Sequence, residues 1–208
     1  MSDYNQCREQ PITSPKQREA IRMLRTTPRF VFVPKQDPPA APPRQLADPT
    51  IVFQVAFNRQ VDGRIVRRIR ELFEKKKHDL TQYGEAASGD DPGYIYCFHD
   101  IGDRPDVLKI GRTKRTPEER LVEWERELSP EIGQSLIILC AYPTECNEFA
   151  EDIFKALLAC RQIHNRINPH TGAELTEFFT IDNAMATNIF IRETLRFIND
   201  FWRRAAGR

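Results

Sequence analysis

Two short apolar runs place polar side chains where they could act on a phosphate group. The first is GYIYCF, residues 93–98, which contains Tyr96, and the second is KIGRTKR, residues 109–115, which opens on Lys109. A tyrosine ordinarily has a pKa of about 10, so it accepts a proton near neutral pH only if neighbouring cations lower that value. Lys109 and Arg120 are the candidates for this effect.

Hydrolysis of a phosphodiester develops negative charge on the phosphorus oxygens, so a site for it needs cationic side chains and usually a divalent metal. Arg120 offers a planar fork of hydrogen-bond donors near the start of a predicted helix. Glu151, in the next predicted helix, is a carboxylate that could hold Mg²⁺ together with water. Local ion pairs are the alternative, because Arg120 could pair with Glu123, and Glu151 precedes Lys155 by four residues.

Hydrophobic periodicity predicts an α+β domain in residues 91–208, with strands joined by a short hairpin and then by helices. The strands are expected at 93–100, 107–112, 135–142 and 175–181, and the helices at 116–128, 144–163 and 184–204. Thr116 and Glu119 form a capping box that marks the start of the first of these helices. In the last helix, side chains recur at helical intervals at Met185, Ile189, Arg192, Leu195, Ile198 and Trp202.

The first ninety residues differ in character. Nine of the fifteen prolines lie in residues 1–50, which predicts a flexible, extended Pro-rich segment. Residues 51–90 are interpreted as a strand at 50–57, although so short a run does not exclude a helix, followed by a basic amphipathic helix at 61–80. Its basic residues, among them Arg67, Arg68 and Lys75, either contact a phosphate backbone or form an ordinary solvated face.

The charge distribution limits how the chain could bind a polyanion. The net charge is +1, but residues 1–90 hold 16 Lys and Arg against 11 Asp and Glu, and the remainder holds 15 against 19. Nucleic acid would therefore contact a local patch, for which Arg112, Lys114 and Arg115 are the candidates besides the basic helix.

Two further features bear on the compartment. No apolar run approaches the eighteen residues of a membrane-spanning helix. Five cysteines without a CxxC pair predict reduced thiols and an intracellular protein, with nucleus and cytoplasm both open.

The order GYIY, KIG, helix arginine, helix glutamate and EFF resembles the GIY-YIG nuclease superfamily over roughly residues 92–182. The similarity is closest to the phage T-five DNA-binding branch, which reads KIG where the nucleases read YIG. The resemblance implies a three-stranded antiparallel sheet flanked by helices. It also implies that Tyr96, Lys109 and Arg120 are catalytic and that Glu151 binds Mg²⁺, or Mn²⁺ in its place. Glu177 matches the EFF motif, and for it we expect no role beyond packing.

Two departures from the nuclease pattern leave the function open. Lys109 replaces the second tyrosine, and no histidine or tyrosine lies between Arg120 and the third strand. Three hypotheses follow: a metal-dependent endonuclease, a DNA-binding protein that does not cleave, and an inactive protein-interaction module on the same scaffold, which the net negative charge of residues 91–208 favours. A protein partner could also bind through the N-terminal region. The first two require the predicted site residues to converge on a common pocket.

Overall fold

The computed structural model describes residues 48–85, 90–100, 104, 106–128, 136–168, 171–181 and 183–208. The predicted Pro-rich segment therefore lies almost entirely outside the described residues. The helices are α2 Pro49–Phe57, α3 Gly63–Tyr83, α4 Pro117–Leu128, α5 Asn147–Leu158, the short 3₁₀ helix η1 Ala159–Arg161 and α6 Ala184–Ala205. The strands are β1 Gly93–Asp100, β2 Val107–Thr113, β3 Leu136–Thr144 and β4 Phe178–Thr180.

The four strands form one antiparallel sheet in the order β3-β1-β2-β4. The predicted α+β class is confirmed, and the sheet has four strands where the resemblance implied three. In the hairpin of β1 and β2, Tyr96 lies opposite Gly111 and Phe98 lies opposite Lys109. Because side chains alternate along a strand, this register brings Tyr96 and Lys109 to the same face of the sheet.

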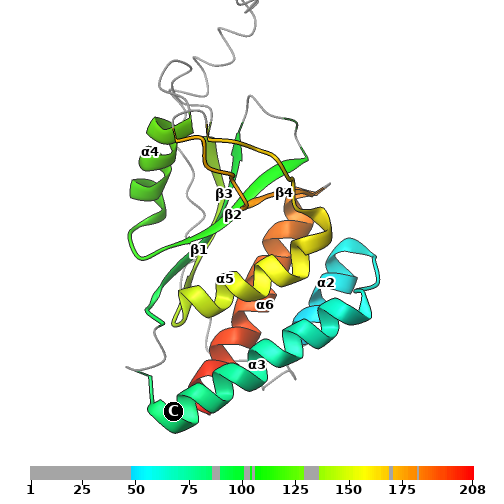
Figure 1. The fold of residues 1–208 in the computed structure, drawn as a ribbon, viewed down its shortest axis with the longest axis vertical. Coiled ribbons are helices and arrows are strands. Elements are labelled where there is room, and N and C mark those ends of the chain that lie inside the picture. The colour runs from blue at the N-terminus through cyan, green and yellow to red at the C-terminus, as the bar shows by residue number, and fades with distance from the viewer. Residues whose placement is uncertain are drawn as a thin grey trace, which may run out of the picture. The chain divides into compact units, whose positions relative to one another are not determined.

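The two faces of the sheet pack against different helices (Figure 1). One face meets α5 and α6, and its buried strand residues include Ile95, Cys97, Leu108 and Ile110. The opposite face meets α4, where Leu121 and Trp124 pack on Tyr96, Phe98 and Val107. Burial of apolar side chains on both faces holds the sheet between its helices.

Residues 50–57, predicted as a strand, form helix α2 instead. The Asp48 side chain caps this helix by accepting a hydrogen bond from the Thr50 backbone nitrogen at 2.8 Å, and a proline follows at the first helical position. The Phe53 ring packs edge-on against Phe190 of α6, with centroids 5.7 Å apart. A short apolar run fits either structure, and here the cap and the packing on α6 stabilise the helix.

Helix α3 has the predicted amphipathic character and packs against the domain that follows it. Its Phe73 ring meets Phe149 of α5 and Phe201 of α6 edge-on, at centroid distances of 5.1 and 4.7 Å. Lys76 lies 3.3 Å from the buried carboxylate of Asp90, which in turn accepts hydrogen bonds from the first backbone amides of α5. Residues 63–83 thus share a core with the sheet.

The inward face of α6 differs from the predicted series at its start. Met185 and Ile189 are 71% and 44% exposed. The buried residues are Thr187, Phe190, Ile191, Thr194, Leu195, Ile198 and Trp202, which follow the same period on a slightly rotated face. Helical spacing predicts how often buried residues recur along α6. Packing against the neighbouring helix α2 determines which side of α6 these residues lie on.

Two smaller observations concern the thiols and the membrane. The cysteines that the structure describes, Cys97, Cys140, Cys146 and Cys160, are all free. Among the described helices, none has both the length and the apolar character needed to span a bilayer.

Candidate functional site

Tyr96 lies at the centre of the face covered by α4, and the glycine opposite it is needed there. Tyr96 is 1% exposed. A Cβ atom on Gly111 would lie only 2.7 Å from the Tyr96 hydroxyl oxygen and 3.1 Å from a carboxylate oxygen of Glu177. Glycine is therefore the residue that lets the tyrosine and the glutamate approach the strand.

The environment of Tyr96 raises its pKa instead of lowering it. Burial is the main cause, and the negative charge of Glu177 adds to it, while Arg120 and a hydrogen bond from Trp124 act in the opposite direction. The Trp124 indole nitrogen donates that bond to the Tyr96 hydroxyl at 3.0 Å. The expectation that Lys109 and Arg120 would make this tyrosine a better base is wrong, because desolvation outweighs the neighbouring cations.

Lys109 is buried on the same face and is paired. It is 2% exposed, and its Nζ donates to a carboxylate oxygen of Glu177. The ammonium group also lies 3.7 Å from the centroid of the Trp124 ring, within the range of a cation–π contact. Burial lowers the pKa of Lys109 to about 8, although the Glu177 carboxylate opposes this effect. Glu177, for which no role beyond packing was expected, is the ion-pair partner of this lysine.

Arg120 reaches the same group from the first turn of α4. The predicted capping box is present, since the Thr116 backbone nitrogen donates to Glu119 at 3.0 Å and the Glu119 nitrogen donates to the Thr116 hydroxyl at 3.3 Å. The guanidinium of Arg120 lies 4.8 Å from the Trp124 ring centroid and 2.7 Å from Glu123. We call Tyr96, Lys109, Arg120, Trp124 and Glu177 the Tyr96 cluster.

Glu151 takes part in a different set of contacts. It lies on α5, which packs on the opposite face of the sheet from α4. Its Oε2 atom lies 3.2 Å from Arg112 Nε and 2.9 Å from Lys155 Nζ, so the local ion pair with Lys155 is present. Of the four residues expected to converge on a common pocket, the structure joins three in the Tyr96 cluster, where Tyr96 and Lys109 are almost fully buried, and places Glu151 with Arg112 and Lys155. The expectation of one open pocket formed by all four is therefore wrong, and any DNA contact has to be sought elsewhere on the surface.

These contacts also bear on whether Glu151 could bind the magnesium ion that the resemblance implies. One oxygen of the Glu151 carboxylate already meets two cationic side chains, which a divalent cation would have to displace. Over the described ranges, no three His, Cys, Asp or Glu side chains form a group that could hold a metal ion. Mg²⁺ in proteins is usually bound through one or two carboxylates and completes its coordination with water and substrate phosphates. In the present arrangement Glu151 could ligate a divalent cation only by giving up its contacts with Arg112 and Lys155.

The basic residues at the end of β2 are all held by acidic partners. Arg112 Nη1 lies 3.0 Å from Glu148 Oε1, in addition to the contact with Glu151. Lys114 pairs with Asp91, and Arg115 pairs with Glu123. The pair of Lys114 and Asp91 is more than half exposed, so it stabilises the fold little and can be exchanged for a phosphate. Arg112, with two carboxylates, is the least available of the three.

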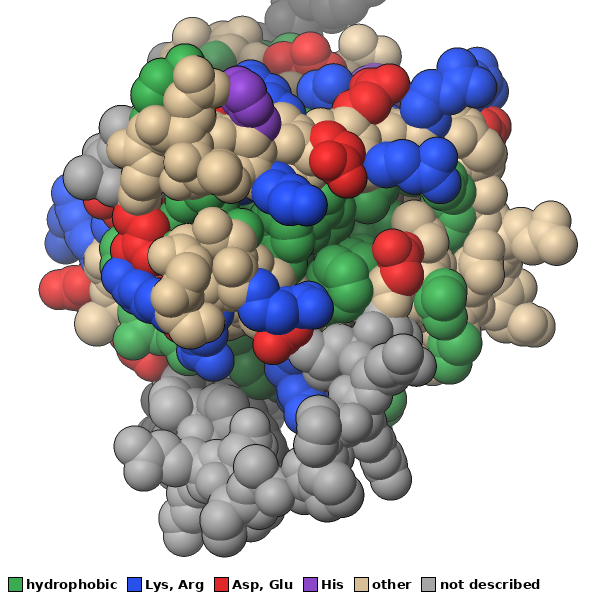
Figure 2. Space-filling view, turned by 90° about the horizontal axis from the view of Figure 1, so that it is seen from below, with side chains coloured by type: hydrophobic (Ala, Val, Ile, Leu, Met, Phe, Trp, Pro, Cys, Tyr) green, Lys and Arg blue, Asp and Glu red, His purple; other side chains and the backbone are tan. Residues whose placement is uncertain are grey.

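The predicted basic residues of α3 are exposed to solvent. Arg67, Arg68 and Lys75 all lie on its outer face, and of these Arg68 pairs weakly with Glu71 at 3.9 Å. Figure 2 shows a face of the molecule on which Lys and Arg side chains alternate with Asp and Glu around a hydrophobic area. On this face charges of both signs are interspersed.

Sequence reasoning missed Trp124 and the role of Glu177. Trp124 follows Arg120 by four residues on one helix, so helical spacing alone would have placed the two side chains together. Glu177 is separated from Lys109 by 68 residues. No local pattern predicts such a pair, and the motif that contains Glu177 was its only signal.

Comparison with known proteins adds one finding. No curated protein and no solved structure is significantly similar to the chain. The family model of the T5orf172 domain matches residues 93–198, which is more than half of the chain and includes every member of the Tyr96 cluster. The protein therefore belongs to the T5orf172 domain family.

Proposed function

We propose that this protein binds DNA and that helix α3 supplies phosphate contacts beside the T5orf172 domain. The observation behind this proposal is the outer face of α3, whose exposed basic residues are Arg64, Arg67, Arg68, Arg70, Lys75 and Lys77. Four of these form no ion pair with any residue that the structure describes, namely Arg67, Arg70, Lys75 and Lys77. Exposed cations without an acidic partner gain most from replacing the counterions of DNA phosphates.

Family membership supports the same proposal. The T5orf172 domain is consistent with a DNA-binding or nuclease-like function. We further infer that the domain is a GIY-YIG-like fold with KIG as its second motif. This inference is supported by the hairpin register, in which Tyr96 lies opposite the glycine of KIG, and by the need for a glycine at that position.

Binding without cleavage is the form of the proposal that the contacts favour. Tyr96 is buried and its pKa is raised, so its hydroxyl is a poor proton acceptor at neutral pH. Lys109 is buried against Glu177, and Glu151 is neutralised by Arg112 and Lys155. Each group that hydrolysis would use is already engaged in a contact within the fold.

A metal-dependent endonuclease is the second candidate. It is favoured by one observation, which is that Tyr96, Lys109 and Arg120 lie together although they come from three different elements. Mg²⁺ or Mn²⁺ would be its metal, and binding of either would require Glu151 to exchange its present partners. The suggested protein partner of the N-terminal region concerns residues outside those described.

DNA binding is tested by charge reversal on α3. We expect the full chain to bind a labelled duplex of about 20 base pairs at low salt, and the triple variant Arg67→Glu, Arg68→Glu, Lys75→Glu to bind it at least about tenfold more weakly. The matched control reverses three arginines of α6 that have acidic partners, Arg192, Arg196 and Arg204, with the same change in net charge. Equal affinity of the two triple variants would refute the assignment to α3, and absence of binding by the unmodified chain would refute DNA binding.

Cleavage is tested separately with single-stranded, duplex and branched DNA, in the presence of Mg²⁺ or Mn²⁺ and with chelator. We expect no cleavage under any of these conditions. Metal-dependent nicking that is lost in Glu151→Ala, with DNA affinity retained, would overturn the non-cleaving proposal and establish the endonuclease.

A further inference from the structure

A second surface of the domain has the chemistry to receive a nucleotide, and it lies apart from the Tyr96 cluster. A pocket of about 470 Å³ opens at the end of the sheet where β1, β3 and α6 meet. Pockets that hold small organic groups have volumes of about 300 to 1,000 Å³. Its lining comes from four parts of the chain, which are residues 92–94, Lys114, residues 143–145, and Asn199 with Arg203 on α6.

The apolar part of the pocket wall consists of a tyrosine and two prolines. Tyr94 is half-buried and lies directly across the ladder from Pro143 of β3. Pro92 lies two residues before Tyr94, at the entry to β1. Every DNA base can stack on an accessible aromatic ring.

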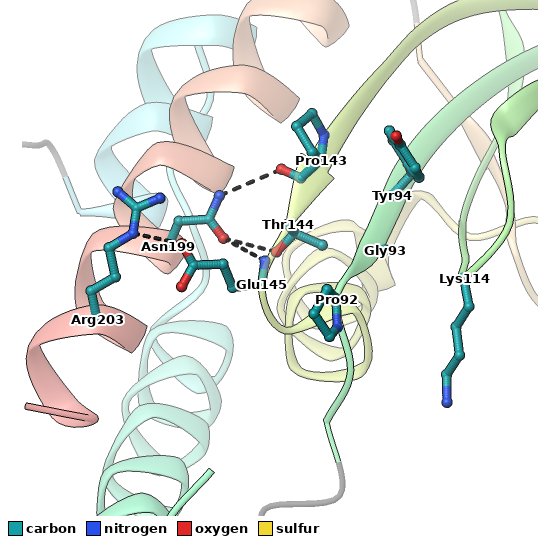
Figure 3. A pocket seen from close by; sticks show the side chains of 9 residues that line it. All are labelled: Pro92, Gly93, Tyr94, Lys114, Pro143, Thr144, Glu145, Asn199 and Arg203. Atoms are coloured by element: carbon teal, nitrogen blue, oxygen red, sulfur yellow. Dashed lines mark hydrogen bonds and ion pairs between the residues drawn. The ribbon is translucent and has the colours of Figure 1, made fainter. Parts of the chain in front are cut away.

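A fixed amide reaches the β3 side of the pocket from α6 (Figure 3). The Asn199 side-chain oxygen accepts hydrogen bonds from the Thr144 hydroxyl at 2.9 Å and from the Glu145 backbone nitrogen at 3.2 Å, which fixes its orientation. The Asn199 nitrogen makes only a long contact of 3.5 Å with the Pro143 carbonyl oxygen. This amide nitrogen therefore retains a donor for an oxygen atom of a base.

Two cationic side chains lie at opposite sides of the pocket. Figure 3 shows Lys114 and Arg203 flanking it, with Thr144 and Pro92 between them. Lys114 pairs with Asp91, and Arg203 Nε lies 2.6 Å from Glu145 Oε1. Both cations are more than half exposed, so their ion pairs contribute little and a DNA phosphate can take the place of a carboxylate.

We propose that this pocket binds one unpaired nucleotide of single-stranded DNA, with the base on Tyr94, the amide of Asn199 at the base edge, and Lys114 and Arg203 on the flanking phosphates. The proposal rests on the proposed DNA binding and assigns to it a site separate from α3. In a duplex both faces of a base are covered by its stacked neighbours, so only an unstacked base can lie on the Tyr94 ring. The pocket therefore distinguishes single-stranded DNA from duplex DNA.

The test compares an oligothymidylate of about 15 nucleotides with a duplex of similar length, using the full chain and fluorescence anisotropy. We expect Tyr94→Ala to lose about tenfold in affinity for the single strand, and Tyr94→Phe to retain the affinity because the ring is kept. Duplex affinity should be unchanged in both variants. Arg203→Gln, which avoids any change in the strand, should reduce the salt slope for the single strand by about 0.7.

A base analogue gives a direct readout of stacking. An oligonucleotide that contains 2-aminopurine should lose fluorescence on binding to the unmodified chain and to Tyr94→Phe, and should keep it with Tyr94→Ala. If Tyr94→Ala and Arg203→Gln both bind the single strand as the unmodified chain does, the pocket assignment is wrong, whereas DNA binding through α3 still stands. Equal affinities for thymidine monophosphate and for the oligonucleotide would also contradict the assignment of the pocket to single-stranded DNA, because they would identify a site for a mononucleotide. Failure of the unmodified chain to bind any DNA would instead refute the proposed function itself.

Discussion

The buried ion pair of Lys109 and Glu177 makes the stability of this protein depend on pH in a direction that can be worked out. Lys109 is almost fully buried, and burial lowers its pKa from an ordinary value of 10.5 to about 8. This difference corresponds to about 3 kcal/mol in the free energy of holding the proton. Replacement of Lys109 by methionine, which has a similar length and no charge, removes the effect.

The sign follows from comparing the folded and unfolded chains. Below about pH 8 both hold the proton on Lys109, and the folded state bears the cost of the buried charge. Between about pH 8 and 10.5 the folded protein has released this proton while the unfolded chain still holds it, so the free energy of unfolding rises with pH. From about pH 7 to about pH 10 we expect the unmodified protein to gain about 2.5 kcal/mol relative to Lys109→Met.

The assay is chemical denaturation of both proteins at several pH values, followed by circular dichroism. Taking the difference between the two proteins removes the titration of all shared groups. Lys114→Met is the matched control, because it makes the same change at a lysine that is more than half exposed. A difference between the unmodified protein and Lys109→Met that stays constant, or that falls with pH, would refute the burial of a charged lysine in this cluster.

Three further predictions concern the residues that position the site. Gly111→Ala should destabilise the fold by about 2 kcal/mol or more in thermal denaturation, because its Cβ would lie 2.7 Å from the Tyr96 hydroxyl oxygen. The control Gly63→Ala meets no atom within 4 Å and should leave the stability unchanged or raise it. Thr116→Ala should cost about 1 kcal/mol through loss of the helix cap, and an unchanged melting temperature would contradict the capping box. Arg112→Ala should lower stability but leave DNA affinity nearly unchanged, and the reverse result would show that Arg112 contacts DNA.

Local sequence signals predicted much of the fold because the relevant interactions are short in range. The capping box of α4 and the alternating pattern of β1 are both formed within a few residues, and both are present. Residues 50–57, for which a strand was predicted and a helix not excluded, form a helix because Asp48 and the following proline are a helix-start signal. Packing against α6, which no local pattern contains, then stabilises the helix.

The site was predicted less completely for a different reason. The local pairs of Arg120 with Glu123 and of Glu151 with Lys155 follow from spacing, and the structure contains both. The partner of Lys109 is distant in sequence, and its identity depends on how β2 meets the segment before β4. The direction of the pKa change at Tyr96 likewise depends on burial, which residue types alone do not give.

The central claim, that DNA is bound through phosphate contacts on α3, is tested most directly by the salt dependence of duplex binding. The logarithm of the binding constant should fall linearly with the logarithm of the salt concentration, with a slope of about −0.9 for each phosphate contact. We expect the reversal of Arg67, Arg68 and Lys75 to make this slope shallower by about 2 to 3. An affinity that does not change with salt, or a slope that is the same in the triple variant and the unmodified protein, would contradict the claim.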